Sequence, residues 1–200
     1  MKKQKDKLRE LADSHGGYFR FSEAIIAGVH RATLHSLRNK GFIELVSRGL
    51  YRMAEAEPHP YPDFAQVALR APNVVVCLIS ALSFHGITTQ IPHQVDLAVV
   101  KGARPPQISY PPIEVYHVSE PAFSSGIETH VLGGVDVRIY SIEKTLADCF
   151  KFRNQIGTDV AVEALKLYRE QKRLNVKNLM KYSRLCRVVR VMEPYLEALI

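Results

Sequence analysis

Three prolines within five residues divide the chain into two parts of unequal length. They stand at positions 58, 60 and 62 in the segment EPHPYPDF. Proline lacks a backbone donor and disfavours helical conformation in the residue before it, so no regular helix is expected to run through this segment. We therefore expect a small N-terminal domain, a proline-rich linker and a larger C-terminal domain, comprising residues 1–57, 58–63 and 64–200.

The net charge of the chain is +7 over 200 residues, and it is unevenly distributed. Residues 1–57 carry 11 basic and 7 acidic side chains, and residues 151–190 carry 11 and 3. Between these basic zones, residues 58–150 carry 5 basic and 8 acidic side chains. A basic surface favours polyanionic partners, nucleic acids above all.

The composition indicates a cytoplasmic protein without metal or cofactor. No apolar run approaches the roughly 20 residues that span a bilayer, and the N-terminal MKKQKDKLRE lacks the apolar core of a signal peptide. Cys77, Cys149 and Cys186 are far apart and form no C-x-x-C motif, which is typical of reduced thiols. The eight histidines show no spacing typical of metal ligands.

Apolar periodicity and glycines predict the order of elements in the N-terminal domain. Leu8, Leu11 and Ala12 form a helical stripe that the pair Gly16-Gly17 ends. A short strand over residues 18–21, a helix over 23–27 capped by Ser22, a turn at Gly28, a helix over 30–40 and a hairpin over 42–53 are expected to follow. This order is that of a winged helix-turn-helix.

The helix RATLHSLRNKG, residues 31–41, has one polar face that carries no carboxylate. Leu34 and Leu37 lie on the opposite side at roughly 100° per residue. The interpretation that competes with DNA binding is a merely solvated face. Arginine and asparagine suit base edges in the major groove, and a cation at the hairpin tip suits phosphate. The expected DNA-binding residues are Arg31, Thr33, His35, Ser36, Arg38, Asn39, Arg48 and Arg52.

The C-terminal domain shows a mixed pattern, so the fold class is α+β. A helix is expected over residues 63–70, and the apolar segment 73–87 has a helical second half that His85-Gly86 ends. Ser141 is a good cap for a helix with apolar positions up to Phe150, and three more helical segments follow. Between these helices we expect four strands, over residues 94–100, 113–118, 126–132 and 135–140.

The sequence resembles the abortive-infection AbiEi family of type IV antitoxins. The resemblance rests on HGGYFRFSEAIIAGVHRATLHSLRNKGFIELVSRGLYRM, then CLISALSFHGI, QVDLAVVKGARPP, VRIYSIEKTLADCFKFR and VVRVMEPYLEAL, in that order. It implies an N-terminal domain that binds operator repeats and represses its own operon. It also implies a C-terminal domain that neutralises a companion nucleotidyltransferase-like toxin without a stable complex.

The rival hypothesis is an enzyme that acts on nucleic acid, with the winged helix as its targeting domain. Metal-dependent cleavage needs paired carboxylates, but DLAVVK (residues 96–101) has Val99, and GGVDVR (residues 133–138) has Arg138, at the second position. Ser80 and His85 are five apart, which separates them by about 140° on a helix. The sequence therefore favours a protein that is not an enzyme.

An antitoxic surface has weaker support in the sequence. Asp148 lies off the apolar stripe of its helix, where the alternatives are a salt bridge to Lys144 or Lys151 and a contact with the toxin. The basic zone up to residue 190 has three possible roles: further DNA contact, contact with an acidic partner or RNA, and simple solvation. The candidate residues for the antitoxic surface are Ser80, Arg104, Asp148, Lys151 and Arg153.

Overall fold

The computed structural model describes residues 2–56, 60–171 and 175–198. By its contacts the chain divides into two compact units, residues 1–69 with 131–136 and residues 70–130 with 137–200. Residues 57–59 of the predicted linker lie outside the described part. The limits of the predicted domains stay a prediction.

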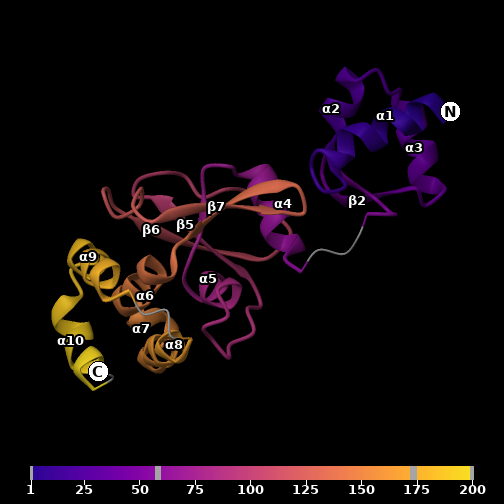
Figure 1. The fold of residues 1–200 in the computed structure, drawn as a ribbon. Helices are drawn as coiled ribbons and strands as arrows, with labels where there is room; N and C mark the ends of the chain where they lie inside the picture. The colour runs from indigo at the N-terminus through magenta and orange to yellow at the C-terminus, as the bar shows by residue number, and fades with distance from the viewer. Residues whose placement is uncertain (1, 57–59, 172–174, 199–200) are drawn as a thin grey trace. The chain divides into compact units, whose positions relative to one another are not determined.

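The first unit holds three helices and a three-stranded antiparallel sheet of order β1-β3-β2. Figure 1 shows α1, α2 and α3 around this sheet, in indigo and purple. A fourth helix follows the proline-rich segment. The elements are α1 (Lys2–Asp13), β1 (Tyr18–Arg20), α2 (Phe21–Ile26), α3 (Arg31–Asn39), β2 (Ile43–Ser47), β3 (Leu50–Met53) and α4 (Pro62–Arg70).

One apolar stripe of each helix builds the core of this unit. Leu8 of α1 and Leu34 and Leu37 of α3 are almost fully buried, together with Phe19 of β1 and Ile43 of β2. The predicted helices, turn and hairpin are thus present, and they form a winged helix.

The start of α2 differs from the prediction. The helix begins at Phe21, so Ser22 lies inside it and Arg20 is the cap. The reason is that β1 runs directly into the helix: the backbone N–H of Phe21 donates to the carbonyl of Gly49 at 2.8 Å. The carboxylate of Glu23 then accepts from the backbone N–H of the cap residue Arg20 at 2.8 Å, as the acidic residue of a capping box does.

The second part of the chain builds a five-stranded mixed sheet of order β6-β5-β4-β8-β7. The strand β5 is parallel to β6 and antiparallel to β4, and β4 is parallel to β8. The strands are β4 (Val75–Val76), β5 (Val95–Val100), β6 (Ile113–Val118), β7 (Ile127–Leu132) and β8 (Val135–Tyr140). The helices are α5 (Leu78–Phe84), α6 (Ile142–Lys151), α7 (Arg153–Ile156), α8 (Thr158–Glu170), α9 (Val176–Cys186) and α10 (Val189–Glu197).

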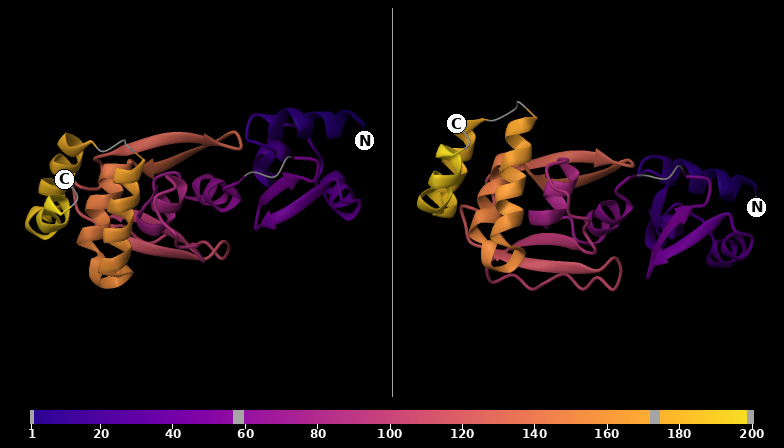
Figure 2. Two further views of the ribbon diagram at one scale, coloured as in Figure 1. Left: turned by 60° about the horizontal axis from the view of Figure 1, so that its bottom comes forward. Right: turned by 90° about the horizontal axis from the view of Figure 1, so that it is seen from below.

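The helix α6 is the centre of the helical part of this unit. It contacts α5, α7, α8 and α9, and α9 packs in turn against α10. The views in Figure 2 show α9 and α10 side by side at the C-terminal end, in yellow. Because α6 is covered on several sides, all its residues from Lys144 to Phe150 are buried. The α+β prediction is confirmed, and α7 is an additional short helix.

Candidate nucleic-acid interface

The helix α3 packs against the core of the N-terminal unit through two leucines. Leu34 and Leu37 are 1% and 2% exposed, and they fix which side of the helix faces outward. Gly28 provides the turn from α2 with a φ of +81°, a conformation that favours glycine. His30 is the N-cap, but its side chain makes no capping hydrogen bond.

The outward face of α3 carries both charged and neutral side chains that can donate hydrogen bonds. Arg31, His35, Arg38 and Asn39 are exposed, and Ser36 is partly exposed. No ion pair within the described part of the chain uses either arginine. Both guanidinium groups are therefore available to an anionic partner.

Two of the predicted DNA contacts are engaged inside the unit. The hydroxyl of Thr33 donates to the Gln4 side chain of α1, so it ties α3 to α1. The guanidinium of Arg52 donates to the carboxylate of Glu44 at 3.0 Å. This pair joins directly opposite positions of β2 and β3. Both residues serve the fold of the unit in this structure.

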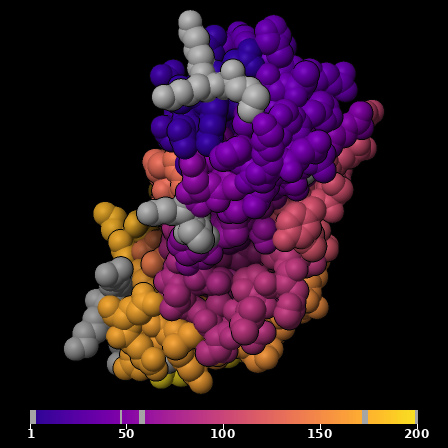
Figure 3. All heavy atoms as spheres, turned by 90° about the vertical axis from the view of Figure 1, so that its right-hand side faces the viewer, coloured from indigo at the N-terminus to yellow at the C-terminus, as the bar shows by residue number. Residues whose placement is uncertain are grey.

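The hairpin between β2 and β3 presents a cation at its turn. Arg48 and Gly49 are exposed there, and Gly49 has a φ of +76°. Figure 3 presents one face of the molecule, with the atoms of the N-terminal unit in indigo to purple. Lys40, which was not among the predicted contacts, is exposed next to Asn39 at the end of α3. The signal in the sequence that could have indicated it is its place directly after a basic helix, where it is the C-cap.

The predicted antitoxic surface is wrong at two of its residues. Ser80 and Asp148 are 0% and 1% exposed and cannot touch a partner in this fold. Asp148 forms an ion pair with Lys144, which is one of the two pairings considered from the sequence. It also accepts from the thiol of Cys186 at 3.3 Å. The physical reason is that α9 covers the side of α6 that the apolar stripe left free.

The other three residues of that set remain accessible. Arg104 is exposed, and Lys151 and Arg153 are partly exposed at the end of α6 and the start of α7. The guanidinium of Arg153 donates to the carbonyl of Phe150 at 2.8 Å, which leaves its other donors available.

The residues considered for catalysis do not form a shared site. The hydroxyl of Ser80 donates to the Gln94 carbonyl at 3.2 Å and accepts from the backbone N–H of Asp96 at 2.8 Å. The imidazole Nε2 of His85 instead lies 2.8 Å from the carbonyl of Tyr140. Within the described residues, no group of three or more histidine, cysteine, aspartate or glutamate side chains is placed to hold a metal ion.

The basic C-terminal zone is exposed where the structure describes it. Lys172 and Arg173 lie outside the described residues. On α9, Lys177, Lys181 and Arg184 recur at helical spacing on the side opposite the buried Leu179. The remaining exposed cations of the zone are Lys166, Arg169, Arg187 and Arg190.

The fold and the charged face of α3 define the class of the N-terminal unit as a winged helix-turn-helix. Residues 6–54 match the family model AbiEi_4, described as "Transcriptional regulator, AbiEi antitoxin". The resemblance to AbiEi antitoxins is thus confirmed for this segment of the chain. This description, a transcriptional regulator and antitoxin, applies to the family that residues 6–54 match.

One solved structure extends the likeness beyond the winged helix. The crystal structure of the RV2827C protein from Mycobacterium tuberculosis matches with a TM-score of 0.58 and 16% sequence identity. The match covers 88% of this chain and 69% of that chain, and it shows a shared fold. No curated protein matches the sequence significantly. Among the described residues, no helix is both long enough and apolar enough to cross a membrane.

Proposed function

We propose that this protein is a sequence-specific DNA-binding repressor that autoregulates its operon and counteracts a companion nucleotidyltransferase-like toxin. The observation that carries the DNA-binding half is the outward face of α3. It presents Arg31, His35, Arg38 and Asn39 and carries no carboxylate. An ordinary solvated helix face of this length mixes both signs of charge, whereas this face suits an anionic partner.

The chemistry of these side chains matches the two kinds of contact that DNA offers. Arginine donates to the O6 and N7 atoms of guanine, and asparagine pairs with the N6 and N7 atoms of adenine in the major groove. We assign Arg31, His35, Ser36, Arg38 and Asn39 to base edges or the adjoining phosphates. Arg48 at the hairpin turn is assigned to phosphate or the minor groove.

The test is binding to the DNA upstream of the protein's own gene. Fluorescence anisotropy with a labelled duplex of that region is compared with a shuffled duplex of the same composition, at a fixed salt concentration. Preference for the upstream duplex of tenfold or more supports the proposal. Equal binding of both duplexes, or no binding, overturns sequence-specific recognition.

For the antitoxic half, the accessible candidates are Arg104, Lys151 and Arg153. We infer that neutralisation of the toxin proceeds without a stable complex, in the cytoplasm, where the free thiols of Cys77, Cys149 and Cys186 stay reduced. We further propose that residues 1–57 carry operator binding and residues 64–200 carry antitoxic activity. Co-expression with the companion toxin tests this half, because an antitoxin restores growth.

The enzymatic alternative has one direct test. If the protein were a nuclease, purified protein would cleave DNA or RNA with Mg²⁺, and Asp96→Asn would abolish that cleavage. We expect no such cleavage, because Asp96 is the lone carboxylate of its strand and is buried at 4% exposure.

A further inference from the structure

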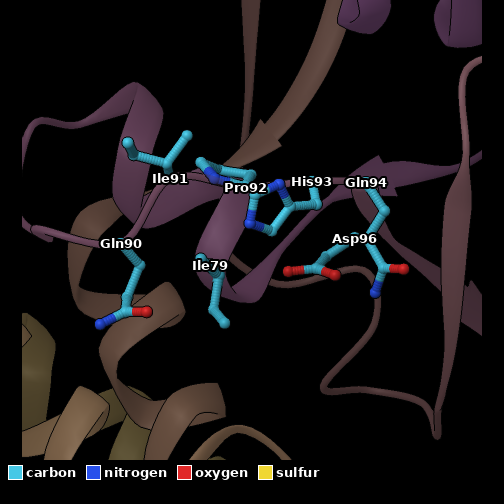
Figure 4. Close-up of a pocket in the computed structure, with 7 residues that line it drawn as sticks. All are labelled: Ile79, Gln90, Ile91, Pro92, His93, Gln94 and Asp96. Atoms are coloured by element: carbon cyan, nitrogen blue, oxygen red, sulfur yellow. The ribbon is translucent and has the colours of Figure 1, made fainter.

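A pocket of about 340 Å³ lies in the larger unit, beside the first turn of α5. Its apolar walls come from Ile79, Ile91 and Pro92. Its polar lining comes from the segment that leads into β5 and is drawn in Figure 4. The volume falls at the lower end of the range for small-ligand pockets, which is a suitable size for one side chain or a small molecule.

The negative group of this pocket is the carboxylate of Asp96, which is 4% exposed. Figure 4 shows it pointing into the space between Ile79 and the His93 ring. Within the chain, the backbone N–H groups of Ile79 and Ser80 and the side chain of Gln94 donate to it. A carboxylate accepts about four hydrogen bonds, so one position stays open. The Gln94 side chain belongs to an exposed residue, so a ligand can displace its amide and gain a second position.

The charges around the pocket favour a cationic ligand. The lining contains Gln90, His93, Gln94 and Asp96 but neither lysine nor arginine. Glu114 lies beside Asp96 in the parallel pair of β5 and β6, and its charge adds to the negative potential there. A phosphate or carboxylate ligand would be repelled by the carboxylate of Asp96. A cation, in contrast, is attracted by the carboxylates of both Asp96 and Glu114.

The walls favour a planar cation over a compact one. A guanidinium group stacks on apolar and aromatic faces while its edge donates two parallel hydrogen bonds to a carboxylate. An ammonium group is a strongly hydrated point charge and gains little from such walls. Ile91 is 79% exposed, so it offers apolar surface to the aliphatic stem of a long side chain.

We propose that this pocket binds an arginine side chain of a protein or peptide partner. The guanidinium group lies between Ile79 and the His93 ring and donates to the carboxylate of Asp96, and the stem lies against Ile91. This assignment is independent of the proposed operator binding, because the pocket lies wholly within the larger unit.

The test uses the full chain, isotopically labelled for NMR, and three blocked amino acids as probes. N-acetyl-arginine amide carries the guanidinium, the citrulline analogue has nearly the same shape without the charge, and the lysine analogue has the charge without the plane. We expect saturable shifts of the amides of residues 79–96 with the arginine probe. Binding of the other two probes is expected to be at least tenfold weaker. Equal binding of the arginine and citrulline probes, or no shift in this segment, overturns the proposal.

Two variants separate ligand binding from folding. Asp96→Asn keeps an oxygen that accepts from the N–H of Ser80 but removes the charge, and we expect tenfold or greater loss of affinity. The His93 side chain is exposed. For His93→Ala we expect a severalfold loss of affinity for the arginine probe, a result that holds even if the first variant fails to fold. His117→Ala, an exposed histidine of β6 outside the pocket, is the matched control and should bind as the wild type does. Unchanged affinity in His93→Ala contradicts the proposed stacking.

Discussion

Lys144 and Asp148 form an ion pair that is closed to solvent, with 0% and 1% of the two side chains exposed. The pair lies within α6, four residues apart, and is supported on two sides. The ammonium group of Lys144 lies 4.0 Å from the centre of the Tyr140 ring, and the thiol of Cys186 donates to the carboxylate of Asp148. The pair therefore links α6 to the end of β8 and to α9.

This arrangement predicts the effect of breaking the pair. Asp148→Ala leaves a buried ammonium group without its counter-charge, so we expect the free energy of unfolding to fall by about 3–5 kcal/mol. Urea unfolding followed by circular dichroism measures it. The double variant Lys144→Met, Asp148→Leu removes both charges and should cost far less. If the double variant is as unstable as the single one, shape and not charge explains the loss.

The helix that holds Asp148, α6, shows where the sequence stops being informative. Its apolar stripe predicted a helix capped by Ser141, and the hydroxyl of Ser141 accepts from the backbone N–H of Lys144 at 3.4 Å. The local pattern could not show that a helix over thirty residues further along the chain brings Cys186 against Asp148. For Asp148 the sequence therefore left a salt bridge and a contact with the toxin as alternatives, and the structure shows the salt bridge, buried.

The face of α3 was predictable because its determinants are local. The spacing of Leu34 and Leu37 alone fixes which side is buried, and the exposed residues followed from it. The pairing of Arg52 with Glu44 was missed, because a turn at Arg48-Gly49 alone would set Arg52 opposite Leu45. A register shift between Leu45 and Ser47 brings Glu44 opposite Arg52 instead. The pocket at Asp96 was beyond prediction, because it depends on how α5 packs beside β5.

Loss of the arginines of α3 should weaken recognition of the operator. We expect Arg31→Ala and Arg38→Ala each to cost roughly 1–3 kcal/mol where a bidentate contact with a base is lost. Anisotropy titrations at one salt concentration measure the change. Arg104→Ala, an exposed arginine of the other unit, is the control. Wild-type affinity in both α3 variants would show that this helix does not read the operator.

Loss of the cation at the hairpin turn should weaken binding to all DNA sequences alike. Arg48→Ala removes one phosphate contact, so we expect weaker binding to specific and shuffled duplexes. We also expect the slope of log K against log salt to become shallower by about one. Lys181→Ala on α9 is compared in the same series. An equal change in the slope for Lys181→Ala would indicate that the basic face of α9 contacts DNA as well. An unchanged slope for Arg48→Ala would show that the hairpin does not contact phosphate.

Protonation of Asp96 should make stability depend on pH. Burial raises the pKa of this carboxyl to about 6, although hydrogen bonds from Ser80 and Ile79 oppose the shift. In the unfolded chain the pKa is about 3.9, so between pH 4 and 6 the folded state binds the proton more tightly. The contribution of this proton to the free energy of unfolding is complete below pH 4 and is lost as the pH rises through 6. Between pH 4 and 7, the free energy of unfolding of the wild type should fall by about 2–3 kcal/mol relative to that of Asp96→Asn. A difference that does not change with pH would contradict this.

The two proposed activities should separate in variants of the undivided 200-residue chain. We expect Arg31→Ala, Arg38→Ala to lose repression of a reporter fused to the upstream region but to restore growth against the companion toxin, because both arginines lie on α3, in the part of the chain to which operator binding is assigned. We expect Lys151→Ala, Arg153→Ala to repress normally and to fail in rescue, since these cations stay accessible while Asp148 is buried. Matched protein levels and melting temperatures exclude the explanation that a variant loses activity through poor expression or misfolding. Rescue by the second variant would show that the end of α6 is not the antitoxic surface. Failure of the first variant to rescue would show that the two activities depend on one another.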